Sequence, residues 1–150
     1  MRQVINQMSM KIESRSVNEG YARMSVAVFV SQLDPTLEEI SDVKTIVSEA
    51  VTNAIVHGYR ERCGYIHIRV RLFDDQTAEI CVRDQGCGIT DVEKAREPMF
   101  TTGNDERSGM GFTIMESFSD KLRVRSGVGK GTTVTLIKKI AGKQHDSGKN

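Results

Sequence analysis

Residues 35–58 read PTLEEISDVKTIVSEAVTNAIVHG and carry the clearest periodic pattern in the chain. Apolar side chains recur there at intervals of three and four residues, which predicts an amphipathic helix with one buried face. They are Leu37, Ile40, Val43, Val47, Ala50, Val51 and Ala54. Asp34 is the predicted N-cap, because Pro35 suits the first helical position and Glu38 and Glu39 suit the first turn. Gly58 is the predicted end of the helix.

Two kinds of pattern flank this helix: alternating apolar positions predict strands, and three- and four-residue spacing predicts helices. The predicted strands are 4–13, 65–72, 78–82, 122–125 and 132–139, and the other predicted helices are 17–33, 91–96 and 108–118. This order predicts an α+β fold, a two-layer α/β sandwich with helices on one face of a mixed, mostly antiparallel sheet. Residues 1–140 form one predicted domain, and the polar residues 141–150 form a predicted disordered tail.

Charge and composition restrict the function. Lysine and arginine total 21 and aspartate and glutamate total 20 among the 150 residues, a formal net charge of +1. This balance argues against a protein whose main task is to neutralise nucleic-acid phosphates or to lie on an anionic membrane. The sequence has no apolar run long enough to span a membrane and no recognisable signal peptide. Three cysteines without paired spacing predict neither a disulfide framework nor a zinc site. We therefore expect a cytoplasmic protein with no direct nucleic-acid or membrane partner.

A polar row lies beside the apolar stripe of the long helix. Glu49, Asn53 and His57 are spaced by four residues, so they occupy neighbouring turns. A carboxamide oxygen is a suitable Mg²⁺ ligand, and a carboxylate one turn away is able to accept a proton from a hydroxyl group. The alternative is a solvated helix edge with a histidine near the last carbonyl groups. The helix by itself leaves both interpretations open.

Glycines follow the second central strand directly. Asp84, Gly86 and Gly88 stand in the order DQGCG, which allows a ligand to approach the backbone while the carboxylate accepts a hydrogen bond from it. An ordinary Asp-Gly turn has the same pattern. The motif is therefore compatible with a binding site but does not require one.

A second glycine motif, Ser108-Gly109-Met110-Gly111, opens the predicted helix 108–118. Glycines at a helix N-terminus expose backbone amides at the positive end of the dipole, which favours phosphate, and the guanidinium of Arg107 suits a terminal phosphate. Capping glycines are also common before helices. The motif lacks the third glycine of a dinucleotide-binding fingerprint, and the chain has no Walker A lysine.

Four segments in this order resemble the ATP-binding boxes of the GHKL superfamily, which includes DNA gyrase and the histidine kinases. The segments are EAVTNAIVHG (49–58), DQGCG (84–88), RSGMG (107–111) and GTT (131–133). Within the superfamily, SEAVTNAIVHGY, MFTT and ERSGMGFTIME resemble the anti-sigma factor kinases. The likeness covers residues 17–139 and implies the Bergerat ATP-binding fold of this superfamily.

The resemblance implies a role for each matching residue. Asn53 would bind the Mg²⁺ that accompanies ATP, and Glu49 would be the general base for an attacking serine hydroxyl. Asp84 would accept a hydrogen bond from the adenine amino group, with Gly88 and Thr133 completing the base pocket. The other implied ATP contacts are Gly86, Thr101, Thr102, Ser108, Gly109, Met110 and Gly111.

Residues 98–107 match the ATP lid of the family. Arg107 would lie near the terminal phosphate and act as a second catalytic residue. Related sporulation proteins usually carry a lysine after the Thr-Thr pair of the lid, whereas this chain has Gly103. Arg107 would therefore have to supply more of the positive charge near the phosphates.

The resemblance also implies an anti-sigma factor that is an ATP-dependent serine protein kinase. Such a homodimer would hold a sporulation sigma factor of the sigma F type away from RNA polymerase. It would also phosphorylate an anti-anti-sigma factor on serine, using ATP and Mg²⁺. Arg23 matches a family contact for either partner, although a solvated helix arginine is the alternative. Two other functions stay open: an ATP-gated partner-binding switch without phosphotransfer, and an anti-sigma kinase of the general-stress type.

Overall fold

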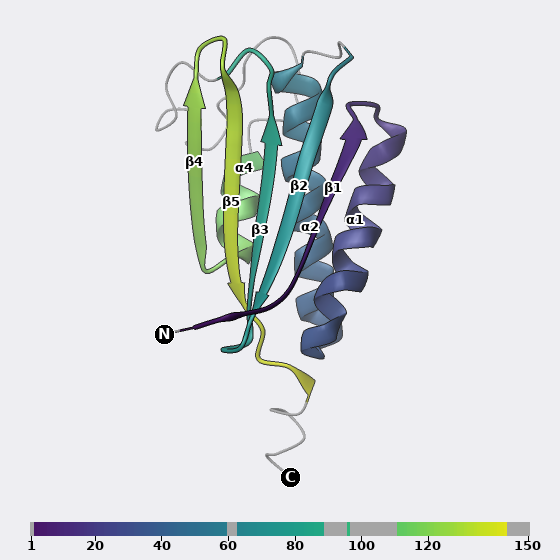
Figure 1. The fold of residues 1–150 in the computed structure, drawn as a ribbon, viewed down its shortest axis with the longest axis vertical. Helices are drawn as coiled ribbons and strands as arrows, with labels where there is room; N and C mark the ends of the chain where they lie inside the picture. The colour runs from purple at the N-terminus through teal and green to yellow at the C-terminus, as the bar shows by residue number, and fades with distance from the viewer. Residues whose placement is uncertain (1, 60–62, 89–95, 97–110, 144–150) are drawn as a thin grey trace.

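A five-stranded sheet carries helices on one of its faces in the computed structural model, which describes residues 2–59, 63–88, 96 and 111–143 (Figure 1). The elements in chain order are β1 (Val4–Glu13), α1 (Val17–Val30), η1 (Ser31–Leu33), α2 (Leu37–Asn53), η2 (Ala54–Gly58), β2 (Tyr65–Phe73), β3 (Thr77–Asp84), α4 (Gly111–Phe118), β4 (Lys121–Gly127) and β5 (Gly131–Lys139). The predicted α+β sandwich is confirmed. Within the described residues, no helix has the length and apolarity needed to cross a membrane.

The strand order is β1-β2-β3-β5-β4, and every pairing among the described strands is antiparallel. The sequence predicted a mixed sheet, and this part of the prediction is corrected. The helices α1 and α2 return the chain to the end of the sheet where β1 finishes, so that β2 runs back along β1 (Figure 1). The amide of Ser14 donates to the carbonyl of Gly64 over 2.8 Å at that end.

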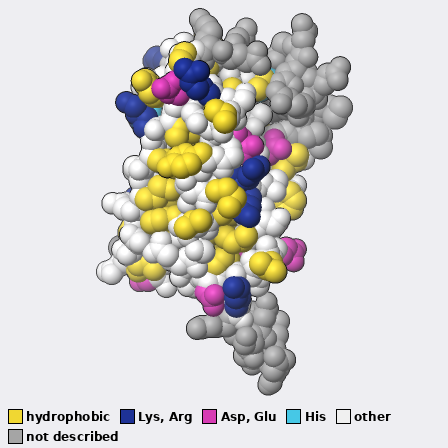
Figure 2. Space-filling model, turned by 90° about the vertical axis from the view of Figure 1, so that its right-hand side faces the viewer, with side chains coloured by type: hydrophobic (Ala, Val, Ile, Leu, Met, Phe, Trp, Pro, Cys, Tyr) yellow, Lys and Arg dark blue, Asp and Glu magenta, His cyan; other side chains and the backbone are white. Residues whose placement is uncertain are grey.

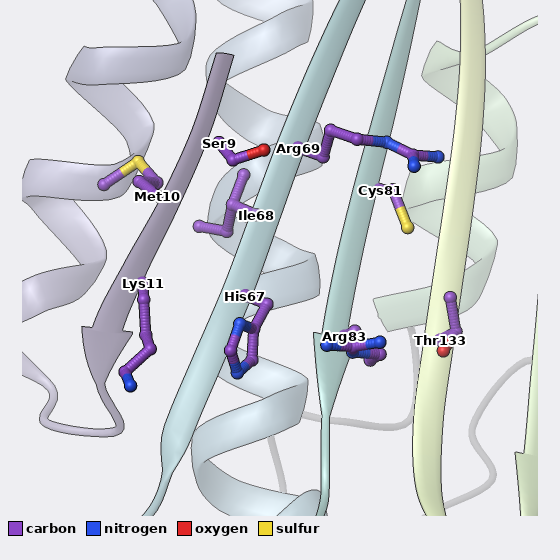
Figure 3. A pocket seen from close by; sticks show the side chains of 9 residues that line it. All are labelled: Ser9, Met10, Lys11, His67, Ile68, Arg69, Cys81, Arg83 and Thr133. Atoms are coloured by element: carbon purple, nitrogen blue, oxygen red, sulfur yellow. The ribbon is translucent and has the colours of Figure 1, made fainter.

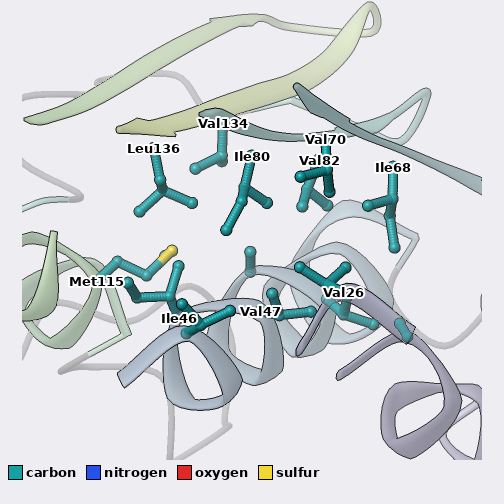
Figure 4. Close-up of a cluster of buried hydrophobic side chains, with 14 of the residues drawn as sticks. Val26, Ile46, Val47, Ile68, Val70, Ile80, Val82, Met115, Val134 and Leu136 are labelled. Atoms are coloured by element: carbon teal, nitrogen blue, oxygen red, sulfur yellow. The ribbon is translucent and has the colours of Figure 1, made fainter. Parts of the chain in front are cut away.

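Side chains alternate between the two faces of each strand, so the core lies between the sheet and the helices. In β2, Ile66, Ile68, Val70 and Leu72 are buried. Figure 4 shows the meeting of the two layers: side chains from α1, α2 and α4 contact those of the central strands. The buried residues labelled there include Val26, Ile46, Val47, Met115, Ile80, Val134 and Leu136.

The start of α2 differs from the prediction. Thr36, not Asp34, is the N-cap: its hydroxyl accepts from the Glu39 amide at 3.1 Å, and the Glu39 carboxylate accepts from the Thr36 amide at 2.9 Å. This reciprocal pair satisfies two amides that the first helical turn leaves without a partner. Asp34 instead has left-handed backbone angles (φ 53°, ψ 53°) at the end of η1.

The first residues after β5 are held against the same helix end. The amides of Ala141 and Gly142 donate to the two carboxylate oxygens of Glu39 over 2.6 and 3.1 Å, and the Lys143 amide donates to the Asp34 carbonyl over 2.8 Å. The rest of the predicted disordered tail lies outside the described residues, as does the predicted helix 91–96 apart from Arg96.

Candidate nucleotide-binding site

The C-terminal end of α2 widens into a π-helical turn. The amide of Tyr59 donates to the carbonyl of Ala54 over 2.9 Å, which is the i→i+5 bond of such a turn. This turn follows directly on Asn53, so His57 does not continue the regular α-helical row of Glu49 and Asn53. The sequence pattern had predicted a regular helix up to Gly58 and no π-turn.

The π-turn brings Gly58 against the loop that follows β3. The Cys87 amide donates to the Gly58 carbonyl over 2.7 Å. A Cβ atom on Gly86 would lie 2.0 Å from that carbonyl oxygen, and a Cβ on Gly58 would lie 2.8 Å from Oδ1 of Asp84. Both positions therefore exclude any side chain, because backbone and carboxylate already fill the space.

Asp84 ends β3 with its carboxylate directed into this contact, and only 5% of the residue is exposed. Its Oδ1 accepts from the Gly86 amide at 2.8 Å. Burial raises the pKa of Asp84 above its ordinary value, and hydrogen bonds from the backbone amides of Gly86 and Thr132 offset only part of that rise. A buried carboxylate with glycine backbone around it is suited to accept a hydrogen bond from a ligand.

The same loop packs against the β4–β5 turn. Gly88 has a φ of +79°, and a Cβ there would lie 2.1 Å from the Gly127 carbonyl oxygen. Gly131 has a φ of +86°, and its Cβ would lie 2.1 Å from the Asp84 carbonyl oxygen. The Gly129 amide donates to the Cys87 carbonyl over 2.8 Å. The DQGCG loop is thus fixed on two sides by backbone contacts.

Asn53 faces the first residue of α4. A Cβ on Gly111 would lie 3.0 Å from both Oδ1 and Nδ2 of Asn53. Glu49 lies one turn earlier on α2, and both side chains are partly exposed. The structure therefore brings the carboxamide to the N-terminus of α4, where helix geometry favours anionic groups.

Thr133 is not beside Asp84. In the β3–β5 register Thr133 is opposite Arg83, and Figure 3 shows it with Arg83 and His67 on the face of the sheet away from the helices. Thr132 is opposite Asp84 and is the residue whose amide bonds the carboxylate. Because neighbouring residues of a strand point to opposite faces, Thr132 lies on the Asp84 side of the sheet and Thr133, the predicted neighbour of Asp84, lies on the other side.

The remaining predicted residues are Arg23 and six residues whose structure is not described. Arg23 lies on α1 and forms an ion pair with Glu19 over 3.4 Å. Six predicted ATP contacts lie outside the described residues: Thr101, Thr102, Arg107, Ser108, Gly109 and Met110. In the described ranges, no group of three or more His, Cys, Asp or Glu side chains gathers in a metal-binding arrangement.

The groups present fit ATP and its magnesium ion. Asp84 offers a buried acceptor, the backbone contacts of Gly86 and Gly88 fix the loop that holds it, and Asn53 offers a hard oxygen ligand beside a helix N-terminus. A Mg²⁺ ion would be held by Asn53 together with phosphate oxygens, as is usual for this cation.

Residues 12–138 match the family model of the histidine kinase-like ATPase domain. The curated relatives include the anti-sigma F factor of Geobacillus kaustophilus, 54% identical over 91% of this chain and 94% of its own length. The anti-sigma F factor of Bacillus subtilis is 51% identical over 91% of this chain and 94% of its own length.

Solved structures share the fold at low sequence identity. One contains the RsbU and RsbW domains of a Mycobacterium tuberculosis protein; it is 20% identical, with a TM-score of 0.66 over 90% of this chain and 32% of that chain. A mycobacterial sensor histidine kinase is 17% identical, with a TM-score of 0.57 over 86% of this chain and 97% of that chain.

Proposed function

The chain belongs to the histidine kinase-like ATPase family, among the anti-sigma F factors, and on that premise we propose that it is an anti-sigma factor with serine kinase activity. It binds ATP with Mg²⁺ and holds a sigma factor of the sigma F type away from RNA polymerase. It transfers the terminal phosphoryl group to a serine of an anti-anti-sigma factor. These partners place its action in the cytoplasm, where RNA polymerase works.

The observation that carries the proposal is the Asp84 carboxylate, buried among glycines at the end of β3. The adenine amino group is a hydrogen-bond donor, and a buried carboxylate acceptor selects for it because an unmet polar group there is costly. Thr132, rather than Thr133, completes this end of the site. Gly86 and Gly88 allow the loop to pack against Gly58 and Gly127, which holds the Asp84 carboxylate in place for the base.

Asn53 and Glu49 form the phosphate end of the proposed site. Asn53 ligates the Mg²⁺, which neutralises phosphate charge when it is bound. Glu49, one turn earlier, accepts the proton of the attacking serine hydroxyl. Arg107 and the backbone of Gly109 and Gly111 contact the phosphates. Positioning and charge neutralisation supply most of the catalysis in phosphoryl transfer. These groups are of the chemical types that such catalysis requires.

A surface of α1 supports the proposed protein partners. Val17, Tyr21, Met24 and Val28 are exposed to 79%, 63%, 48% and 66%, and their spacing places them in one stripe along the helix. Figure 2 shows hydrophobic side chains gathered on this side of the molecule. Such a stripe is typical of a protein-binding surface. We propose that the sigma factor and the anti-anti-sigma factor contact this part of α1, with Arg23 beside it.

The test is a transfer reaction with a candidate anti-anti-sigma protein, ATP and Mg²⁺, followed by mass spectrometry for phosphoserine. We expect phosphoserine with the wild type and none with Glu49→Gln, while Glu49→Gln still binds ATP. Thr133→Ala is the matched control, because that side chain lies on the other face of the sheet. A wild type that binds ATP and partner without transferring phosphate would instead be an ATP-gated switch.

A further inference from the structure

The face of the sheet opposite the helices carries a row of basic side chains. The strand registers align Lys11 with His67, His67 with Arg83, Arg83 with Thr133, and Thr133 with Arg125. Figure 3 shows the first four of these side chains following one another across the strands. We call Lys11, His67, Arg83 and Arg125 the basic row. It extends from β1 to β4 at one level of the sheet, with Thr133 of β5 between Arg83 and Arg125.

This face of the sheet has an excess of positive charge, whereas the charges of the whole chain nearly cancel. Outward-facing cations on the strands are Lys11, Arg69, Arg71, Arg83, Lys121, Arg123, Arg125 and Lys139, and the outward-facing carboxylates are Glu13 and Glu79. The complete sequence has 21 basic and 20 acidic residues. Like charges on adjacent strands destabilise a sheet. An anionic partner would offset that cost.

The few acids on this face are engaged away from the basic row. Glu79 pairs with Arg71 at 2.6 Å and with Arg69 at 3.6 Å, and Glu13 pairs with Arg15 at 2.8 Å. Among the described residues, no carboxylate forms an ion pair with Lys11, Arg83 or Arg125. The positive charge of the basic row is therefore not neutralised within the described part of the chain.

The surface around the row is hollowed. A depression of about 470 Å³ lies over β1, β2, β3 and β5, and Lys11, His67, Arg69, Arg83 and Thr133 are among the residues that line it. The N-terminal segment crosses this face at the other end of the sheet (Figure 1). The Arg2 guanidinium lies 4.1 Å from the centre of the Phe73 ring there. Three members of the basic row, Lys11, His67 and Arg83, line this hollow.

We propose that the basic row binds an acidic segment of a protein partner, at a site separate from the nucleotide site. This inference does not rest on the proposed kinase activity. Adjacent strands are about 4.8 Å apart and one helical turn rises about 5.4 Å. A partner helix laid across the strands, with Asp or Glu on successive turns, therefore presents carboxylates near the spacing of the row. Arginine is suited to bidentate pairing with such carboxylates.

Two other occupants fit less well. Sheets that bind single-stranded nucleic acid stack bases on aromatic side chains, and the lining of the hollow has only His67 as a planar ring. A second copy of this chain, placed face to face by a two-fold axis, would bring the same cations together. Charge complementarity therefore favours an acidic polypeptide.

The experiment uses a fluorescent helical peptide with glutamate on every turn, and its glutamine counterpart, in anisotropy titrations with the full chain. We expect the glutamate peptide to bind, with an affinity that falls as salt increases. Arg83→Glu combined with Arg125→Glu should weaken binding by about tenfold or more. Lys44→Glu combined with Lys130→Glu reverses the same charge on α2 and in the β4–β5 turn, and should change the affinity by less than about twofold.

Several outcomes would overturn the proposal. One is equal binding of the glutamate and glutamine peptides, and another is an equal loss of affinity in the Lys44→Glu/Lys130→Glu control. The others are tighter binding of a single-stranded oligonucleotide through Arg83 and Arg125, and self-association of the chain that Arg83→Glu with Arg125→Glu abolishes. Arg83→Gln with Arg125→Gln, expected to weaken binding severalfold, keeps the test valid if the charge-reversed chain fails to fold. ATP binding, measured on the same samples, separates a failure of this proposal from a failure of the proposed function.

Discussion

The continuous helical segment of α2 and η2 has a carboxylate at each end, Glu39 and Asp84, and the two carboxylates have opposite pKa shifts. At the N-terminal end, burial raises the pKa of Glu39, but hydrogen bonds from the amides of Thr36, Ala141 and Gly142 outweigh it and lower the pKa overall. At the C-terminal end, burial of Asp84 beside Gly58 prevails over its amide hydrogen bonds and raises the pKa.

The contrast distinguishes a carboxylate that holds the fold together from one that we propose is kept for a ligand. Glu39 gains enough amide partners in its charged form to stabilise the helix start and the segment after β5. Burial raises the pKa of Asp84, so the surroundings of this carboxyl favour its neutral form and the charged form costs stability. Such a cost is expected where a buried acceptor awaits a donor from a bound molecule.

The largest expected effect comes from breaking the close contact at the Asp84 end. Gly86→Ala would place a Cβ 2.0 Å from the Gly58 carbonyl oxygen, so the loop and the π-turn would have to separate. We expect a loss of about 3 kcal/mol or more in the free energy of unfolding, measured with urea. Gly129→Ala is the control: its φ is +76° but nothing lies within 4 Å, so only backbone strain of about 1 kcal/mol applies. Equal losses in the two variants would contradict the close-contact account.

Asp84→Asn tests the ligand role of the same end. Replacing the charged acceptor should weaken ATP binding about 10- to 100-fold, because hydrogen bonds to charged groups contribute about 1.5–3 kcal/mol. Isothermal titration calorimetry measures the change. Glu39→Gln, a matched amide substitution at the other end of α2, should leave ATP affinity within about twofold. If both substitutions weakened ATP binding alike, the two carboxylates would not have separate roles.

Glu39→Ala tests the structural role of the N-terminal end. The variant loses the capping interaction with Thr36 and the hydrogen bonds from Ala141 and Gly142. We expect the free energy of unfolding to fall by about 1–2 kcal/mol, with ATP affinity unchanged. Unchanged stability would mean that water replaces these bonds without cost.

Acidification should change the contributions of Glu39 and Asp84 to the free energy of unfolding in opposite directions. The lowered pKa of Glu39 means that its stabilisation is present above the unfolded-state pKa and is lost as pH falls through the folded-state pKa. The raised pKa of Asp84 means that its protonation favours the fold as pH falls, while ATP binding begins to weaken at a higher pH than for an ordinary aspartate. Urea unfolding and ATP titrations at several pH values, with Glu39→Gln and Asp84→Asn beside the wild type, measure this smallest effect. ATP affinity that stays flat into the acid range would refute the Asp84 part.

Elements with strong periodicity were predictable because burial of one face determines them. The long helix and both hairpins followed from apolar spacing and are confirmed. The predicted N-cap of α2, Asp34, was wrong. The sequence does contain a signal for the observed N-cap, because Thr36 and Glu39 have the spacing of a capping box. The position of Thr132 beside Asp84 was also predictable from the sequence. Val134 and Leu136 are buried, and alternation along the strand places Thr132 on their face and Thr133 on the other.

The π-turn had no local signal. It depends on Gly58 meeting Gly86, a contact between segments distant in the sequence, and periodicity describes only neighbours along the chain. The glycine spacing predicted that a ligand approaches the backbone, whereas the structure fills the space beside Gly86 and Gly88 with the carbonyl groups of Gly58 and Gly127. The roles of Glu49, Asn53 and the residues from Thr101 to Gly111 stay predictions.

The central claim is that ATP and its magnesium ion bind between α2 and the glycine loop, and calorimetric titration of ATP tests it most directly. The wild type should bind ATP more tightly with Mg²⁺ than without it, and Asn53→Ala should lose that difference while the folded state persists. No heat of binding with folded wild-type protein, or an Asn53→Ala variant that keeps the full magnesium dependence, would contradict the account.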